Sequence, residues 1–514
     1  MKYISSVVIL CCIMLCSCKK MIDLYPESNL NTGTYYSNYD EVKSGLNSVY
    51  NSLYRPLYRE WQFTELRSDN SVQGVPASTN ALNRDLSDLD MFIPATSHAA
   101  VYSYWQDAYF SIRDANIILQ KLGVIYDPAT GAISLEPISI PISDVDRKQF
   151  AGEALFIRGY QYFNLVRLFG GVFLIHKPIS APESKTINRS PVADIYKMID
   201  ADLTAASGYL SSLKFNQIAA ADKGKATAWA AKALLAKVYL TLNRKADAIT
   251  LLQDVITNSG YSLQSTYASV FSITNELNSE ILFAVRYKAG GLGLGSSFGN
   301  DFGPLNSGST VINGSGLGWN TPSTDLDTAF IASDARRPVT IAVYGSGSAA
   351  ELYVKKYLTP VTITNDGESD WPVIRYADVL MMMAEAKGFS PESIGYINQI
   401  RTRAGLAVLP ASVNTVALFE KALADERRLE FAFENHRWYD LVRYNTTLTT
   451  ITAEQTIKNY FAHEYAAHYS HYTAPVPTIA SLQANVTANK LLLPIPQHEI
   501  DTNTQLVIPQ NPGY

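Results

Sequence analysis

The chain has 514 residues, of which 47% are hydrophobic and 17% charged, and its formal net charge is −5 at pH 7. A chain of this size and composition can bury an extensive core, and it predicts either several domains or one elongated repeat body. The mildly acidic balance, with no cluster of Lys and Arg, argues against nucleic acid or an anionic lipid surface as a partner.

The N-terminus carries a secretory signal that ends in a candidate lipidation site. It holds all four cysteines of the chain: Cys11, Cys12, Cys16 and Cys18. The apolar run over residues 7–16 has the length of a signal core and is too short to span a membrane. Leu15 and Ser17 stand three residues and one residue before Cys18, which resembles a bacterial lipobox. We therefore expect residues 1–17 to be removed and Cys18 to carry a lipid, with an ordinary cleaved signal as the alternative.

A polar segment follows, and then helices begin. Residues 18–39 contain Pro26 and several Asn and Ser, which indicates a lipidated tether along the surface. Helices are expected from Asp40 onward. Apolar residues recur on one helical face over residues 101–122, and a second apolar-rich helix is expected over residues 150–169.

Two later helix pairs are the clearest elements of the chain. Alanine dominates residues 225–242, and after a short turn a buried stripe recurs over residues 248–256. Small side chains let two helices approach closely, so this pair predicts an antiparallel hairpin like a tetratricopeptide unit. A further pair is expected over residues 374–388 and 391–404. Because no strict repeat period is present, we predict a mainly α fold in which such pairs form a globular body.

Between these pairs the chain is irregular. Residues 289–318 are rich in Gly, Ser and Asn, and residues 67–98 form a second polar stretch. Loops of this length are usually functional or disordered, and a rigid frame commonly presents binding residues on its loops. The AGGLGLG run is interpreted as a flexible loop, because its glycines do not have the spacing of a phosphate loop. A few short strands are expected, at residues 281–285 and 338–343.

Two patterns resemble metal sites and are interpreted otherwise. His463 and His468 in HEYAAH are five residues apart, about 140° around a helix, and cannot chelate one Zn²⁺ as the i, i+4 pair does. Asp366, Glu368 and Asp370 alternate like calcium ligands, but the EF-hand pattern is absent and a solvated turn is the preferred interpretation. Neither a metal nor a cofactor is predicted.

The run DERRLEFAFENHRWYDLVRY, residues 425–444, needs a separate interpretation. Glu426 and Glu430 lie one helical turn apart, a separation that could suit a glycosidase pair. The adjacent arginines would lower the pKa of both carboxyls and spoil either as a general acid. The preferred interpretation is a set of structural ion pairs: Arg427 with Glu430, and Arg437 or Arg443 with Asp440. No nucleophile, base and oxyanion group converge in the sequence, so no enzymatic activity is predicted.

Several motifs together resemble one protein family. In chain order they are TELRSDN (64–70), YFSIRDAN (109–116), IRGYQYFNLVRLFGGVFLI (157–175), WPVIRYADVLMMMAEA (371–386), INQIRTRAGL (397–406), ERRLEFAFENHRWYDLVRY (426–444), LLPIPQHEI (492–500) and QNPGY (510–514). With the lipobox they resemble the SusD/RagB family of nutrient-capturing surface lipoproteins over nearly the whole chain. The chain departs from the family pattern at Asn435 and His436, where a Gly-containing pair is usual, and at Cys16 of the lipobox.

The resemblance implies an α-helical body of tetratricopeptide-like pairs with an embedded, irregular ligand-binding region. It implies an N-terminal region over residues 40–224 and a C-terminal region over residues 225–514. It further implies a lipid-anchored, surface-exposed protein of the outer membrane. Its partner would be a SusC-like TonB-dependent transporter, and its ligands oligosaccharides or sometimes peptides, bound without chemistry.

In this family, ligand contacts come from aromatic and polar residues of loops equivalent to residues 67–98 and 289–319. The candidates that this implies are Trp61, Phe63, Asp69, Asn70, Phe298 and Trp319. Trp319 is the strongest, because a flat indole in a glycine-rich loop offers a platform to a sugar face; packing or turn formation is the alternative for each. Trp105 and Trp229 are expected in the core. A glycoside hydrolase and a helical scaffold for other proteins are the alternative functions.

Overall fold

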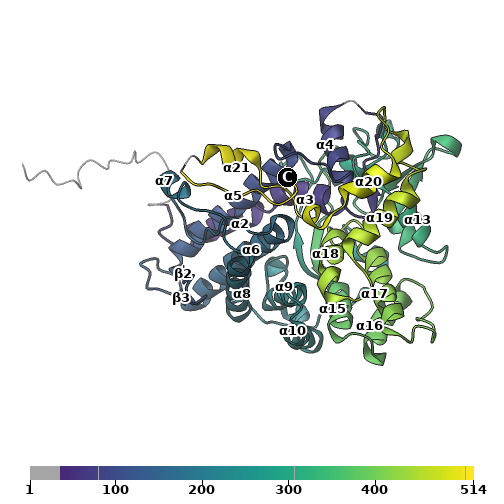
Figure 1. Cartoon of the computed structure of the whole chain (residues 1–514). Coiled ribbons are helices and arrows are strands. Elements are labelled where there is room, and N and C mark those ends of the chain that lie inside the picture. Colours follow the sequence, from purple (N-terminus) through teal and green to yellow (C-terminus); the bar gives the residue numbers. More distant parts are fainter. Residues whose placement is uncertain (1–34, 79, 306, 504) are drawn as a thin grey trace, which may run out of the picture.

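The computed structural model describes residues 35–78, 80–305, 307–503 and 505–514, and it is mainly helical (Figure 1). Its longer helices are α2 Tyr39–Asn51, α3 Tyr54–Thr64, α4 Ala81–Asp90, α5 Ala99–Lys121, α6 Asp144–Phe169, α8 Val192–Tyr209, α9 Ala228–Thr241, α10 Lys245–Asn258, α15 Tyr376–Lys387, α16 Pro391–Arg403, α17 Val416–Glu430, α18 Arg437–Thr447 and α19 Ala453–Glu464. Its shorter helices are α7 Ala181–Ser184, α11 Tyr267–Val270, α12 Phe298–Phe302, α13 Thr324–Ala329, α14 Arg337–Thr340, α20 Ile479–Asn485 and α21 Gln497–Thr502. Within the described ranges, no helix has the length and apolar content needed to cross a membrane. The predicted signal peptide and Cys18 lie outside these residues.

The helices pack as neighbouring pairs, and the predicted fold class is confirmed. α6 lies against α5 and α8, while α9 lies against α10, which also contacts α15. Figure 1 shows α8, α9, α10, α15 and α16 following one another across the body. The side chain of Thr227 caps α9 by accepting a hydrogen bond from the amide of Ala230. The alanine-rich faces of α9 are buried, so α8, α10 and α15 can approach it closely.

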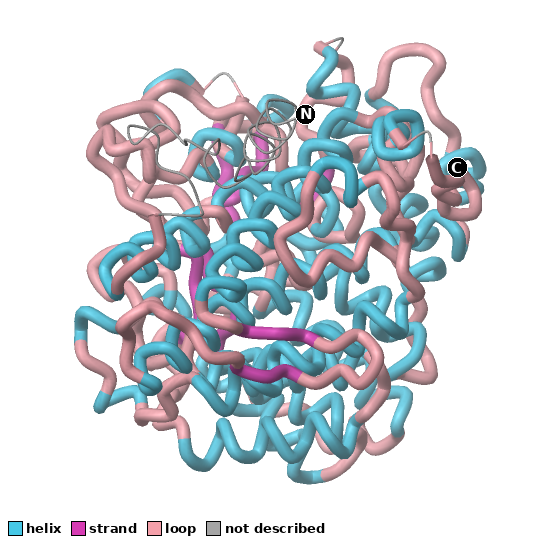
Figure 2. Tube along the Cα trace, turned by 90° about the vertical axis from the view of Figure 1, so that its left-hand side faces the viewer, coloured by secondary structure: helices cyan, strands magenta, loops and turns pink. Residues whose placement is uncertain are grey.

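Among the described residues, short strands pair into four antiparallel two-stranded sheets (Figure 2). The pairs are β1 Ser71–Val72 with β5 Thr321–Pro322, β2 Val124–Tyr126 with β3 Ile133–Leu135, β4 Ile281–Val285 with β8 Trp371–Arg375, and β6 Ile341–Tyr344 with β7 Glu351–Val354. The strand predicted over residues 281–285 is confirmed. The one predicted over 338–343 is partly wrong, because α14 occupies its first residues and β6 starts at Ile341. The β1–β5 pair joins the first irregular stretch to the residues that directly follow the second.

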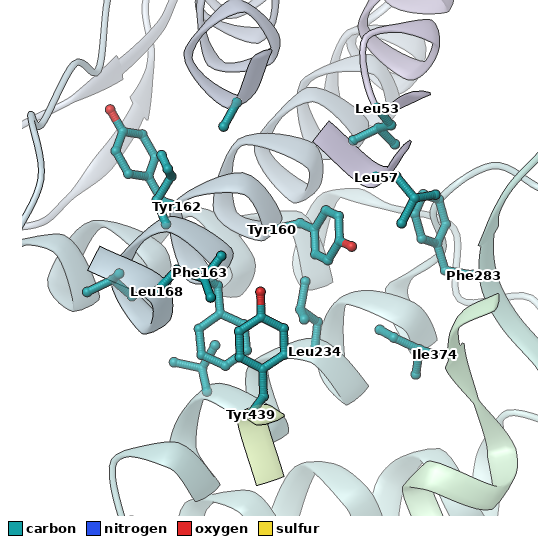
Figure 3. Packing of buried hydrophobic residues seen from close by; sticks show 14 of the residues in the cluster. Leu53, Leu57, Tyr160, Tyr162, Phe163, Leu168, Leu234, Phe283, Ile374 and Tyr439 are labelled. Carbon is teal, nitrogen blue, oxygen red and sulfur yellow. The ribbon is translucent and has the colours of Figure 1, made fainter. Parts of the chain in front are cut away.

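One hydrophobic core contains side chains from both of the regions implied by sequence, from Val42 of α2 to Phe461 of α19. In Figure 3, Tyr160 and Phe163 of α6 face Tyr439 of α18. Each large side chain buried in this way contributes about 1.5 to 3 kcal/mol. Trp105 and Trp229 are also buried, as predicted.

The stretch over residues 67–98 is more ordered than its polar composition indicated. Its centre forms α4, whose first turn is capped by Asn80 as it accepts from the amide of Leu82. Leu86 and Leu89 of this helix are fully buried. The prediction of a continuous loop is therefore wrong here, because two buried leucines and a side-chain cap outweigh the polar residues around them.

The charged run over residues 425–444 is largely buried and structural from Glu426 onward, but one predicted ion pair is wrong. Arg427 pairs with Asp440 at 2.8 Å and with Asp378 of α15 at 3.0 Å, and not with Glu430. The predicted pair of Arg443 with Asp440 is confirmed at 2.8 Å. Burial alone would raise the pKa of Asp440, but Arg427 and Arg443 outweigh it and hold that pKa well below its usual range.

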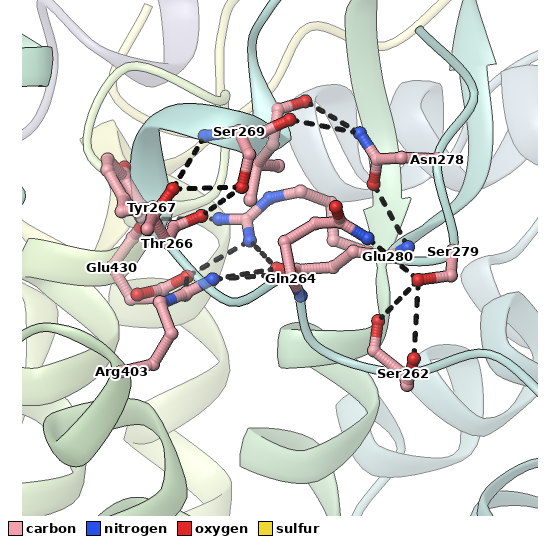
Figure 4. A network of polar contacts seen from close by, with 12 residues as sticks. Ser262, Gln264, Thr266, Tyr267, Ser269, Asn278, Ser279, Glu280, Arg403 and Glu430 are labelled. Atoms are coloured by element: carbon pink, nitrogen blue, oxygen red, sulfur yellow. Dashed lines mark hydrogen bonds and ion pairs between the residues drawn. The ribbon is translucent and has the colours of Figure 1, made fainter. Parts of the chain in front are cut away.

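Glu430 instead joins a second buried network. It accepts from Arg375 at 3.0 Å and from Arg403, and both arginines also bind Glu280 (Figure 4). Burial is again outweighed by these arginines and Arg336, which lower the pKa of Glu430 to about 2. The network fastens the segment that precedes β4 onto α16 and α17.

Candidate functional site

Five of the six predicted binding residues lie in the interior. Trp61 and Phe63 are fully buried, as is Asn70, while Phe298 is 1% and Asp69 is 3% exposed. Trp61 packs edge-to-face on Phe302 and Phe63 on Tyr104, each with ring centroids 5.2 Å apart. Phe298 lies against Trp371 and Tyr287, at 4.6 and 5.6 Å. Four of these side chains build the core beneath the loops, so the predictions for Trp61, Phe63, Asp69 and Asn70 are corrected, whereas Phe298 lines the cleft described below.

Asp69 and Asn70 act as structural anchors. Asp69 accepts a bidentate pair of hydrogen bonds from Arg437, at 2.7 and 2.8 Å, and Arg428 lies 3.2 Å away. Although burial alone would raise the pKa of Asp69, the two arginines lower it well below its usual range. The carbonyl of Asn70 accepts from the amide of Ser323, next to β5. The arrangement holds the two long stretches together.

Trp319 remains a surface candidate. It is half-buried, with its ring packed against the core, and its amide donates to the carbonyl of Asp301 at 2.9 Å. Next to it, the carbonyl of Gly318 accepts from the amide of Gly74, also at 2.9 Å. Gly318 has φ 62°, a backbone conformation that favours glycine. The two stretches therefore converge at Trp319.

An open cleft of about 340 Å³ lies between α3, α5 and the glycine-rich loop. Its lining residues are Tyr54, Arg55, Tyr58, Arg59, Asp107, Tyr287 and 295–298. We call it the Tyr58 cleft. Its volume falls in the usual range for small-ligand sites, and its tyrosine rings lie beside polar side chains and loop backbone. It can offer a stacking surface together with hydrogen-bonding groups.

The helix α3 places these side chains. Tyr54 and Tyr58 are four residues apart, as are Arg55 and Arg59, so each pair lies along one face of the helix. Pro56 fits in the first turn, where its missing N–H is not needed. The sequence analysis overlooked these four residues, although the repeated Tyr-Arg spacing in YRPLYR was a usable signal.

The charges of the cleft are nearly balanced. Arg59 pairs with Asp107 at 3.2 Å, while Arg55 is exposed and has no ion-pair partner within the described ranges. The rings of Tyr54 and Tyr287 lie 4.7 Å apart between centroids. Burial raises the pKa of Tyr58 to about 12, so its phenol is neutral at ordinary pH and can donate a hydrogen bond.

A buried carboxyl lies behind the cleft. Asp301 of α12 is 2% exposed and accepts a 2.6 Å hydrogen bond from the hydroxyl of Ser297. Burial raises the pKa of Asp301 to about 7, from an ordinary value of 3.8. The folded protein therefore binds a proton at Asp301 more tightly than the unfolded chain between about pH 4 and 7.

We expect Asp301→Asn to flatten the pH dependence of stability. Because the folded pKa of Asp301 is raised, protonation of this carboxyl should increase the free energy of unfolding of the wild type as the pH falls from 8 to 5. The variant has no titrating group at this position and lacks this contribution. Each pKa unit corresponds to about 1.4 kcal/mol, so the stability difference between the two proteins should change by a few kcal/mol over this range. Denaturant unfolding at pH 5, 6, 7 and 8 measures it. Parallel curves would show that Asp301 is ionised throughout.

The three carboxylates considered as calcium ligands instead hold the glycine-rich loop. Asp366 accepts from the amides of Gly290 and Gly291, at 2.7 and 2.9 Å, and it is 7% exposed, so the solvated turn predicted here is wrong. Glu368 pairs with Lys288, and Asp370 with Arg286. In the described part of the chain no three His, Cys, Asp or Glu side chains form a metal-binding group.

The chain is similar to known proteins in both halves. Residues 335–514 match a family model described as "SusD family", and residues 22–240 match one described as "Starch-binding associating with outer membrane". SusD-like protein P2 of Formosa agariphila is 27% identical over 468 residues, which cover 83% of each chain. A SusD-like protein of Bacteroides ovatus is 25% identical and covers 96% of this chain and 94% of its own.

Solved structures share the fold. A "Laminarin binding SusD-like protein" is 26% identical, with a TM-score of 0.73, and covers 93% of this chain and 100% of its own. Surface glycan-binding protein A from Bacteroides thetaiotaomicron, in complex with laminarihexaose, is 18% identical with a TM-score of 0.70, over 92% of this chain and 100% of its own. The second likeness concerns the fold alone.

Proposed function

The chain belongs to the SusD family, and from this premise we propose that it captures oligosaccharides at the cell surface without chemistry. In this proposal Cys18 anchors the protein to the outer membrane, and a SusC-like TonB-dependent transporter receives the ligand. The matching family model described as "Starch-binding associating with outer membrane" and the similar "Laminarin binding SusD-like protein" support the proposal.

The Tyr58 cleft is the observation that carries the proposal. Its half-buried rings of Tyr54 and Tyr58 can stack on the C–H face of a sugar. Arg55, Asp107 and the loop backbone can exchange hydrogen bonds with the hydroxyls. We assign ligand contact to this cleft, and we keep Trp319 as a separate candidate contact.

The charges near the cleft favour binding over hydrolysis. Hydrolysis of a glycosidic bond generally needs two carboxyl groups on either side of the bond. Asp107 is the single carboxylate among the residues that line the cleft, and Arg59 neutralises it. Asp301 has the raised pKa of a general acid but is buried behind the loop, where it cannot reach the ligand.

Calorimetric titration with laminarihexaose and maltohexaose tests the proposal, combined with an assay for released reducing ends. We expect binding of at least one oligosaccharide at about micromolar to millimolar Kd, roughly 4 to 8 kcal/mol, and no release. Release of reducing ends would make the protein a hydrolase. Failure of a wider oligosaccharide panel, with binding of peptides or of proteins only, would favour the peptide-binding or scaffold alternative.

We expect Cys18→Ala to produce a folded protein that no longer fractionates with the outer membrane. Each buried CH₂ contributes about 0.8 kcal/mol, so the acyl chains of a lipoprotein hold it firmly in the bilayer. Fractionation is compared in cells that lack the partner transporter, and Cys16→Ala is the matched control. If Cys18→Ala stays in the membrane fraction and Cys16→Ala leaves it, the anchor is assigned to the wrong cysteine.

A further inference from the structure

A second and larger cavity, of about 640 Å³, lies on the other side of α5 and shares no lining residue with the Tyr58 cleft. Its walls are α5, the segment over residues 173–187 that includes α7, and four residues of the C-terminal part, Glu499, Thr502, Asn503 and Ile508. Figure 1 shows α5, α7 and α21 side by side at one end of the body. We call it the α5 cavity.

The walls of the α5 cavity are fixed to one another by hydrogen bonds. Tyr109 of α5 donates to the carbonyl of Phe173, and Asn116 donates to that of Ile175, both at 2.9 Å. The hydroxyl of Tyr102 and His498 Nδ1 share a hydrogen bond of 2.9 Å, which ties α21 to α5. The side-chain amide of Asn188 donates a hydrogen bond of 3.1 Å to the carbonyl of Val507. The cavity is therefore preformed and needs no rearrangement to admit a ligand.

The lining is mainly apolar and partly open to water. Ile117, Ile175, Ile179 and Ile187 are only half-buried, and Phe110 is 42% exposed at the rim. Apolar side chains left in contact with water around a cavity of this size favour a ligand with an apolar body. An oligosaccharide, with hydroxyls on its whole periphery, does not match these walls.

The polar groups of the lining add a net positive charge. Arg113, Lys177 and Lys185 contribute cations, against the single carboxylate of Glu499. Arg113 forms an ion pair with Asp114, but neither lysine has an ion-pair partner in the part of the chain that the structure describes. Burial raises the pKa of Glu499. A negatively charged head group fits this rim.

We propose that the α5 cavity is a second ligand site, which takes an amphiphilic anion with an apolar ring or chain and one carboxylate or sulfonate group. The apolar body would lie against the isoleucines and Phe110. The head group would lie at the rim near Lys177 and Lys185, where its charge is complementary. This site is independent of the oligosaccharide cleft and would hold a ligand of a different chemical class.

Two fluorescent probes with one aromatic skeleton test the proposal. They are anilinonaphthalene sulfonate, which is anionic, and N-phenyl-naphthylamine, which is neutral. The full chain with Cys18→Ala is used, so that neither lipid nor detergent competes. We expect saturable binding of the anionic probe, at least threefold tighter than the neutral one, and displacement by dodecanoate. Equal affinity of the two probes would overturn the anionic specificity.

Four variants locate the site. The double variant Lys177→Ala/Lys185→Ala should bind the anionic probe about threefold to tenfold more weakly. Its affinity for the neutral probe should be unchanged. Ala181→Trp, at an exposed position of the lining, should weaken both probes by filling the cavity. Glu499→Gln should tighten binding of the anionic probe and leave the neutral probe unchanged, whereas partial unfolding would increase binding of both. Lys421→Ala, on the remote helix α17, is the control. An unchanged affinity in Ala181→Trp at wild-type melting temperature would place the probe elsewhere and refute the proposal.

Discussion

Replacing Arg427 with alanine is expected to lower the free energy of unfolding by about 3 to 5 kcal/mol. The guanidinium is fully buried and bridges Asp440 and Asp378, at 2.8 and 3.0 Å. Without it, two carboxylates remain in the core, and among the described residues Arg443 and Lys237 are their remaining ion-pair partners. Denaturant or thermal unfolding measures the loss.

A matched control lies on the same helix. Lys421 pairs with Asp425 one turn away, but both side chains are more than half exposed. Lys421→Ala should therefore change stability by no more than about 0.5 kcal/mol. If Arg427→Ala is as mild as this control, the buried network does not hold α15, α17 and α18 together. If it loses oligosaccharide binding at unchanged stability, the segment belongs to the ligand site.

Tyr58→Ala is expected to weaken oligosaccharide binding about 30-fold, or roughly 2 kcal/mol, which is the loss typical of a central aromatic contact. Tyr58→Phe keeps the ring and should retain most of the affinity, because stacking needs the face and not the hydroxyl. Trp319→Ala, outside the residues that line the cleft, should cost less. Calorimetry with the best-binding oligosaccharide gives all three values.

Tyr396→Ala is the control for this series. Tyr396 is half-buried on α16, like Tyr58 on α3, but it does not line the cleft. Its replacement should leave affinity unchanged. Equal affinities in Tyr58→Ala and Tyr396→Ala, at comparable melting temperatures, would remove Tyr58 from the site. A larger loss in Trp319→Ala than in Tyr58→Ala would move the centre of the site to Trp319.

Much of the fold could be predicted because its helices are long and periodic. The helices expected over residues 225–242 and 391–404 are present as α9 and α16, with ends shifted by at most three residues. Ion-pair partners could not be predicted in the same way. Arg427 has an acid three residues away in Glu430, yet it pairs with Asp378, 49 residues earlier in the chain. Only the packing of α15 against α17 brings these two together.

The binding residues were harder to predict, because an aromatic residue near a loop has the same signature in a core and in a site. Trp61 follows Leu57 by four residues and continues the buried stripe of α3, which could have indicated its burial. Tyr54 and Tyr58 lie seven and three residues before Trp61, on the same side of the helix, so the helical pattern alone does not separate them from the core. What makes them candidates is the glycine-rich loop opposite, more than 230 residues later in the chain, which no local pattern in α3 reveals.

A crystal structure with the best-binding oligosaccharide tests the central claim most directly. The account predicts sugar rings in the Tyr58 cleft, stacked on Tyr54 or Tyr58 and hydrogen-bonded to the loop at residues 295–298. The intact glycosidic bonds should be visible next to the Arg59–Asp107 pair. Sugar density in the α5 cavity, or elsewhere on the surface with the Tyr58 cleft empty, would contradict it.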